Sequence, residues 1–192
     1  NGIGLHDLDF APGLQNTLDN TLSRNELFQN GALGIDLTIG GPVPNGPTAN
    51  DDEDLDVGPN RGQNFPTLDP PVRVGMTTTL SGDLSSAPSS TFRIELFDNS
   101  TCDPSGFGEA ERYLGSVDIT TDGSGDASFS FPTPSFVTFP TATATLLASG
   151  DTSELSPCTD SVMPGGGFLG DRVWHDLDAD GLQAPDEPGL VG

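Results

Sequence analysis

The sequence has no lysine and only six arginines against 29 acidic residues, so its formal net charge is −23. Proteins bind nucleic acids and anionic membrane surfaces through basic patches that displace counterions, and this composition excludes both as partners. The absence of lysine also excludes lysine–asparagine isopeptide crosslinks within the chain. Divalent cations are the ligands that such a charge favours.

Long apolar runs and catalytic signatures are absent as well. No apolar stretch approaches the ~20 residues that a membrane-spanning helix needs, so we expect no membrane insertion. The sequence has no G-x-S-x-G elbow, and no G-x-G-x-x-G follows a strand and opens a helix. Its only histidines, His6 and His175, stand at no suggestive spacing from a cysteine. We therefore expect no enzymatic activity.

Cysteine is scarce, and the two that are present, Cys102 and Cys158, belong to no CxxC pair. A disulfide between them is the simplest interpretation for an exported protein, and two buried free thiols are the alternative. By loop entropy, the bridge would stabilise the fold by about 4 kcal/mol.

One motif predicts a calcium site. The stretch "DLDADGLQAPDE", residues 176–187, fits the pattern D-x-[DN]-x-[DN]-G-x5-E without a gap, and Gly181 allows the sharp turn that the pattern needs. The predicted ligands are the carboxylates of Asp176, Asp178, Asp180 and Glu187 and the backbone carbonyl of Leu182. A solvated acidic turn is the alternative.

The flanks of this motif exclude a helix-loop-helix sensor. Val173 and Trp174 before it suit a strand, and Pro188 and Gly189 after it prevent a helix. The string "GDRVWHDLDADGLQAPDEPGLVG", residues 170–192, resembles the opening of the calcium-binding B-repeat of bacterial serine-aspartate-repeat surface proteins. This resemblance covers only the last 23 residues. It implies a β-sandwich stalk that the ion makes rigid, of which residues 168–192 would be the start.

The N-terminal part contains an internal repeat. "NGIGLHD" at residues 1–7 and "NGALGID" at residues 30–36 share an Asn-Gly entry, aliphatic residues and a final aspartate. Between the two copies, Leu22, Leu27 and Phe28 stand among asparagines, whose backbone tolerates the left-handed conformation found at the corners of a coil. Residues 16–37 resemble the terminal coils of right-handed parallel β-helix proteins, which predicts such coils over residues 1–37. A loop-rich β-segment of another fold is the alternative.

Residues 38–71 are dense in proline, glycine, asparagine and aspartate, which is typical of a linker or capping loop. Five carboxylates stand there within six positions: Asp51, Asp52, Glu53, Asp54 and Asp56. Because cations would relieve their mutual repulsion, the run predicts a second metal site. A solvated acidic run is the alternative.

Short strands separated by turn signals follow from residue 72. They predict an immunoglobulin-like antiparallel sandwich over residues 72–160, with strands at 72–82, 90–99, 112–121, 126–133, 141–149 and 152–158. "GPNRGQNFPTL", "TFRIELFDNSTCDPSGFGEAERYLG" and "GDTSELSPC" resemble the module that follows β-helix repeats in large exported bacterial surface proteins. That resemblance implies surface display or adhesion. A glycine-rich hinge, residues 161–167, follows.

The predicted fold is thus all-β: a partial right-handed parallel β-helix, an immunoglobulin-like sandwich and a C-terminal calcium-loop hairpin. The chain starts without a methionine or signal peptide and stops inside a motif, so we expect a piece of a longer protein or a processed product. Both ends are then unfinished, which predicts a homo-oligomer or filament joined through the ends.

Two functions fit these features. The first is a calcium-stabilised structural or adhesive protein, extracellular or on the cell surface, with a cell-surface glycan or host surface as adhesion partner. The second is the non-catalytic C-terminal tail of a secreted β-helix enzyme that acts on polysaccharides. Such enzymes gather carboxylates or basic residues on a long coil face, and Arg24 is the only cationic residue within residues 1–37.

Overall fold

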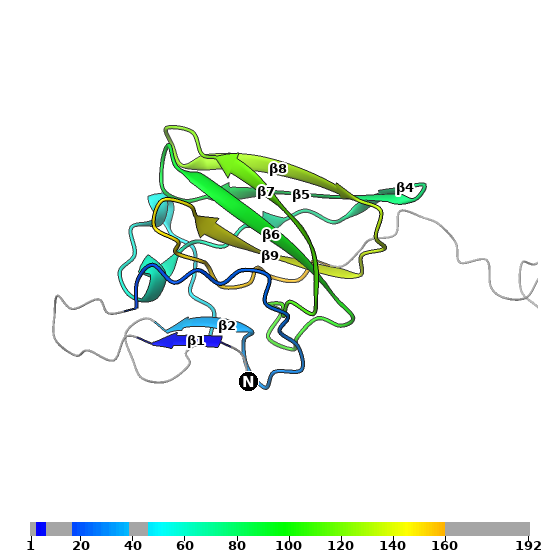
Figure 1. Cartoon of the computed structure of the whole chain (residues 1–192), viewed down its shortest axis with the longest axis horizontal. Helices are drawn as coiled ribbons and strands as arrows, with labels where there is room; N and C mark the ends of the chain where they lie inside the picture. Colours follow the sequence, from blue (N-terminus) through cyan, green and yellow to red (C-terminus); the bar gives the residue numbers. More distant parts are fainter. Residues whose placement is uncertain (1–2, 7–16, 39–45, 160–192) are drawn as a thin grey trace, which may run out of the picture. The chain divides into compact units, whose positions relative to one another are not determined.

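The computed structural model describes residues 3–6, 17–38 and 46–159 (Figure 1). The chain divides into two compact units, Asn1–Val162 and Met163–Gly192, and every described residue belongs to the first. The predicted hinge, the calcium loop and the C-terminal hairpin lie outside the described residues.

The described part is all-β, as predicted, and its sandwich sheets are antiparallel. It contains two short 3-10 turns, η1 (Asp52–Asp54) and η2 (Pro59–Gly62), and no α-helix. No helix within it has the length and apolar character that crossing a membrane would require.

The first sheet is built around a long central strand. Its members are β3 (Thr67–Leu68), β4 (Val72–Val74), β5 (Thr77–Ser85) and β8 (Asp126–Thr133). Strands β3 and β4 pair one after the other with one edge of β5, and β8 pairs with the other edge. A turn at Gly75, whose φ is 59°, separates β4 from β5, whereas the sequence predicted one strand over residues 72–82.

The second sheet has the order β7-β6-β9. Its members are β6 (Thr91–Asn99), β7 (Arg112–Thr120) and β9 (Phe139–Leu146). After β9 the chain turns back along it: the Ser153 N–H donates to the Ala144 carbonyl and the Ser156 N–H to the Ala142 carbonyl, both at 2.9 Å. Residues 151–157 therefore continue this sheet as an irregular outer segment beside β9.

The two sheets pack face to face over one core. Alternation along β5 turns Leu80 and Leu84 inward, and alternation along β6 does the same for Phe92, Ile94 and Leu96. The complete cluster is Leu68, Leu80, Leu84, Phe92, Ile94, Leu96, Phe129, Val137, Ala142 and Ala144. Burial of this apolar area is the main stabilising contribution of the sandwich.

A β-bulge in β7 depends on a glycine. The β6–β7 register shifts between Leu96 and Phe97, so that Leu114 has no partner opposite. The next residue, Gly115, has a φ of 152°, and a Cβ there would lie 2.4 Å from the Phe131 ring. Only glycine lets β7 pass this close to an aromatic residue of β8.

The N-terminal part has one parallel strand pair, β1 (Ile3–His6) with β2 (Ile35–Thr38). The register places Ile3 opposite Ile35, an offset of 32 residues (35 − 3). The repeat predicted from the sequence aligned Asn1 with Asn30, so its offset was three residues too short. The actual repeat is Gly-Ile-x-Leu, which recurs at residues 2–5 and 34–37.

This pair alone does not make a β-helix. Among residues 17–34, the only ladder contact is an isolated antiparallel bridge from Leu27 to Ala110 of the sandwich. The coil prediction places Leu22, Leu27 and Phe28 in the interior of a coil. Phe28 is instead 52% exposed, and Leu22 and Leu27 pack with Ile35 in a second core that the sandwich completes with Phe97, Ala110, Tyr113 and Leu155.

Residues 46–66 cover the end of the sandwich opposite β4 (Figure 1). Asn60, Gln63, Asn64 and Phe65 are buried there. Asparagine side chains take the place of strand pairing in this segment. The Asn64 side-chain amide donates to the carbonyls of Asp51 and Ser85, at 2.7 and 2.9 Å. A segment rich in glycine and proline is thus fixed by side-chain amides rather than by a ladder.

The predicted disulfide is present. Cys102 in the β6–β7 connection and Cys158 after the last segment are bonded, with their Cα atoms 5.9 Å apart. The bond reinforces backbone hydrogen bonds between the same two segments, from the Gly108 N–H to the Ser156 carbonyl at 3.1 Å and from the Cys158 N–H to the Gly106 carbonyl at 3.0 Å.

Replacing both cysteines by serine should lower the free energy of unfolding by about 4 kcal/mol, because the bridge closes a loop across a sequence separation of 56 residues. Denaturant titration measures this change. The reduced native protein should match the double-serine variant, on which reductant should have no effect. An unchanged denaturation midpoint after reduction would contradict a stabilising bridge.

Candidate functional site

Five carboxylates are buried in the described part of this acidic chain: Asp36, Glu95, Asp98, Asp151 and Glu154. A buried ionised carboxylate is costly unless hydrogen-bond donors surround it. Three of the five accept hydrogen bonds from the backbone of residues 19–48. We call residues 17–38 the N-terminal layer. Glu95, Asp151 and Glu154 attach this layer to the sandwich, and we call these three residues the carboxylate clamp.

Glu95 is the first member of the clamp. Alternation along β6 turns Ile94 and Leu96 into the core and Glu95 toward the opposite face. There its carboxylate accepts hydrogen bonds from the Ser23 hydroxyl at 2.6 Å and from the Arg24 N–H at 2.8 Å. The Arg24 guanidinium carbon lies 5.4 Å from the centre of the Tyr113 ring, so cation–π attraction acts beside the clamp.

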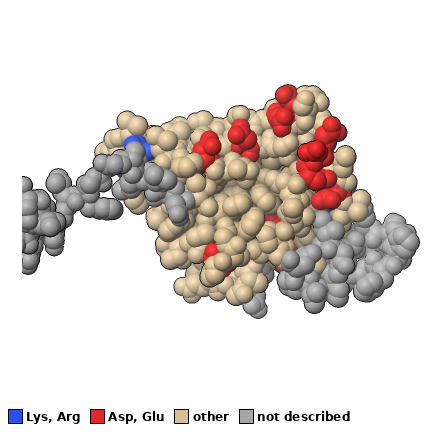
Figure 2. All heavy atoms as spheres, turned by 180° about the vertical axis from the view of Figure 1, so that it is seen from behind, with Lys and Arg blue, Asp and Glu red and all other residues tan. Residues whose placement is uncertain are grey.

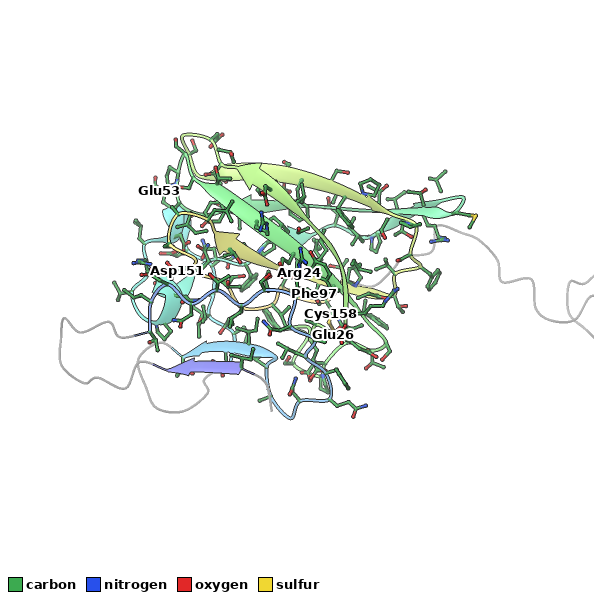
Figure 3. The ribbon with its side chains drawn as sticks, viewed as in Figure 1. Arg24, Glu26, Glu53, Phe97, Asp151 and Cys158 are labelled. Carbon is green, nitrogen blue, oxygen red and sulfur yellow. A yellow bond between two sulfur atoms is a disulfide. The ribbon has the colours of Figure 1, made fainter. Side chains whose placement is uncertain are left out.

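Asp151 is the second member and is completely buried (Figure 3). One carboxylate oxygen accepts the Asp19 N–H at 2.8 Å, and the other accepts the Ser149 hydroxyl at 2.7 Å and a guanidinium N–H of Arg61. Arg61 also pairs with the Asp19 carboxylate at 3.0 Å. Asp151 is the only member of the clamp with a cationic partner in the described structure.

Asn60 completes this contact. Its φ of 44° lies in the left-handed region that asparagine tolerates. Its side-chain oxygen accepts the Asn20 N–H at 2.9 Å, and its amide donates to the carbonyls of Asn20 and Thr152 at 2.8 and 2.9 Å. One buried amide thus connects the N-terminal segment, η2 and the outer segment of the second sheet.

Glu154 is the third member. Its two oxygens accept the N–H groups of Leu37 in β2 and of Thr48, each at 2.7 Å. Burial raises the pKa of Glu154 to about 7; the two backbone donors lower it, and the negative charge of Asp36 raises it further. At neutral pH the ionised Glu154 carboxylate therefore lowers the free energy of unfolding.

The acidic run at residues 51–56 does not converge on one point. Asp54 accepts the Asn64 N–H at 3.3 Å and the Ser86 hydroxyl at 2.6 Å, and burial raises its pKa to about 6. Asp51 accepts the Leu55 N–H, while Asp52 and Glu53 are exposed. Figure 2 shows how acidic side chains gather on the face seen from behind.

The described residues contain no group of three or more His, Cys, Asp or Glu side chains arranged to hold a metal ion. The second metal site, expected at residues 51–56, thus stays a prediction that this arrangement does not support. The calcium ligands expected between residues 176 and 187 lie outside the described residues.

A pocket beside the disulfide is lined partly by Asn30, Asn99, Glu109 and Glu111. Its carboxylates have structural partners: Glu109 accepts the Asn30 N–H at 2.6 Å, and Glu111 accepts the Ser100 N–H at 2.7 Å. These hydrogen bonds fix the loop that carries Cys102. Glu109 is thus a further contact between the sandwich and the N-terminal layer.

Sequence reasoning missed the clamp although its signal was present. Glu95 stands in "RIELF", a single carboxylate inside a strongly apolar strand, and Glu154 stands in "TSELS" among small residues. A carboxylate at such a position needs donors from elsewhere in the fold. The donors lie 71 to 132 residues away in sequence, so no local pattern identifies them.

Replacing Glu95 by alanine should loosen the N-terminal layer, because the Ser23 hydroxyl and the Arg24 N–H lose their acceptor. We expect a loss of about 2 kcal/mol in the free energy of unfolding. Amide exchange should also accelerate in residues 19–37 but not in β5 or β8. The control is Glu26→Ala, which removes an exposed carboxylate from the same segment. Equal exchange in both variants would contradict the role of Glu95.

Stability should fall as pH rises toward neutrality. The pKa of Glu154 is about 7 in the folded state against 4.5 for the free side chain, so the folded state binds the proton more tightly. The stabilisation is complete below pH 4.5 and is lost as pH rises through 7, by on the order of 3 kcal/mol. Asp54 acts in the same direction between its ordinary pKa of 3.8 and about 6.

Urea titrations at constant ionic strength between pH 5 and 8 measure this slope. Glu154→Gln stays neutral throughout and should flatten the slope. Glu26→Gln removes one exposed charge and should keep it. Parallel slopes for the native protein and Glu154→Gln would show that Glu154 does not titrate in this range.

No family model matches the chain, and a search of curated proteins finds no match either. The function must therefore be argued from the arrangement of the chain's own residues.

Proposed function

We propose that the chain is a structural or adhesive module of an extracellular or cell-surface protein, stabilised by calcium and joined to other copies through its ends. One observation carries this proposal. The buried carboxylates of the described part attach chain segments to one another, rather than converging on a site where a substrate could react. Such an arrangement suits a rigid spacer.

The sandwich is proposed to be immunoglobulin-like. Its first sheet has the order β3/β4-β5-β8, and its second has β7-β6-β9 followed by residues 151–157. Consecutive strands thus change sheet between β5 and β6, between β7 and β8, and between β8 and β9. Such changes of sheet are typical of the Greek-key connections of this class and support the assignment.

The parallel pair supports a β-helix that begins before the sandwich. In that architecture each coil adds one strand in parallel register with the strand of the preceding coil. The 32-residue offset between β1 and β2 matches one long coil. The described part gives β1 no partner on its other edge, and a preceding coil would cover that edge.

Calcium is proposed to act at the other end, in the loop of residues 176–187. A divalent ion would neutralise carboxylates that otherwise repel one another, so that the loop becomes rigid only when the ion is bound. The resemblance to a B-repeat supports the same role. Adhesion would use a cell-surface glycan or a host surface.

The full chain should bind one calcium ion at this loop. Calorimetric titration should show that Glu187→Gln, which removes the bidentate ligand, lowers the affinity at least tenfold, a loss of about 1.4 kcal/mol. Chelation should also increase protease cleavage within residues 176–187. Asp52→Asn is the matched control, because it removes an exposed carboxylate of the other acidic run. Identical cleavage with and without chelator would refute a structural ion.

A further inference from the structure

An exposed apolar hairpin lies at the end of the first sheet away from η1. Within the described residues β4 pairs only with β5, so its other edge has no strand partner. Val72, Val74 and Met76 are 54%, 75% and 81% exposed. We name Val72, Val74 and Met76 with the free edge of β4 the β4 patch. Exposed apolar side chains beside a free edge are the usual signature of strand pairing with another chain.

The β4 patch also lacks negative charge. Residues 70–82 contain no acidic residue, and their only charged residue is Arg73. Residues 127–150, which include all of neighbouring β8 except Asp126, contain no charged residue. In Figure 2 the red acidic side chains gather most densely on the side of this face away from the blue basic atoms. Two copies with a net charge of −23 each therefore repel least if they approach through this patch.

Arg73 carries the one positive charge of this stretch, and its repulsion of Arg73 in a second copy is smallest if each guanidinium stays bound within its own copy. Alternation places it on the face of β4 opposite Val72 and Val74. There its guanidinium donates to the Thr78 hydroxyl at 2.8 Å and to the Ser135 carbonyl at 3.1 Å, and lies 5.6 Å from the Phe136 ring. These contacts hold the Arg73 side chain within its own copy, so the valine face stays free.

We propose that the β4 patch pairs with the β4 patch of a second copy, antiparallel and centred on Arg73. This register sets Val72 of one copy opposite Val74 of the other, twice, and Met76 opposite Pro70. All four valines then lie on one face as cross-strand pairs, which stabilise a sheet. Pro70 and Pro71 have no N–H to donate and limit the pairing to this short stretch.

The contact is a lateral one, and it goes beyond the end-to-end joining proposed above. A strand of three residues buries less than the about 1,200 Å² of a specific interface, so the pair is weak in dilute solution. It becomes effective where copies are arrayed side by side, because the local concentration is then high. Two sheets joined in this way form one continuous sheet across both copies.

Site-specific crosslinking tests the register. Full-length Val72→Cys and Val74→Cys proteins are mixed and mildly oxidised with the Cys102–Cys158 bond intact. Directly opposite residues have Cα atoms about 4.5–5.5 Å apart, within disulfide range. Two copies of one variant place their new cysteines two positions out of register, roughly 8 Å apart and beyond that range. The mixture should therefore give a covalent dimer, and either variant alone should not.

Charge variants test the surface. Adding Met76→Asp to both proteins should lower the dimer yield at least about tenfold, because each new carboxylate replaces an apolar side chain and lies opposite Pro70, beside the exposed Asp69 of the other copy. Leu55→Asp is the matched control, because Leu55 is also exposed, at 72%, but follows η1 directly at the other end of the sheet. Its replacement should leave the yield unchanged. Equal crosslinking in single-variant samples, or none in the mixture, would overturn the proposal. The yield should not change with chelator, which separates this contact from calcium-dependent joining through the ends.

Discussion

The described part depends on hydrogen bonds from backbone N–H groups to carboxylates that the sandwich buries. Residues 17–38 form only one short strand of their own, so strand pairing cannot fix them. Glu95, Asp151 and Glu154 replace a ladder by offering acceptors to N–H groups along this segment. Charged acceptors form stronger hydrogen bonds than neutral ones, which offsets part of the cost of desolvating them. Two cores, one inside the sandwich and one beneath the N-terminal layer, can then coexist.

Much of the sandwich could be predicted from sequence because its information is local. Residues 90–99 and 112–121 were expected as strands, and β6 and β7 occupy Thr91–Asn99 and Arg112–Thr120. Alternation, β-branched residues and turn signals are sufficient for that. The bonding of Cys102 to Cys158 followed from composition, since two cysteines leave a single pairing.

The attachment of the N-terminal layer could not be predicted, because its determinants are distant in sequence. Leu22 and Leu27 have the pattern of a coil interior, but nothing local reveals that Phe97 and Leu155 cover them. The acidic run was interpreted as a cation site from its charge alone. In the structure, Asp54 holds Asn64 and Ser86, a role decided by residues 10 and 32 positions away. Local patterns indicate strands, whereas long-range contacts decide which polar groups remain available.

The position of two clamp residues on the last segment has a mechanical consequence. Asp151 and Glu154 hold Asp19 and Leu37, and Cys158 follows only four residues after Glu154 (158 − 154). A pulling force that enters through Asp19 and Leu37 is therefore transmitted to residues 151–158, while Glu95 transmits force from Ser23 and Arg24 to β6. The core around Leu80 and Phe129 contains none of the three clamp residues. Tension between the N-terminal layer and the sandwich is thus opposed first by the hydrogen bonds of the clamp.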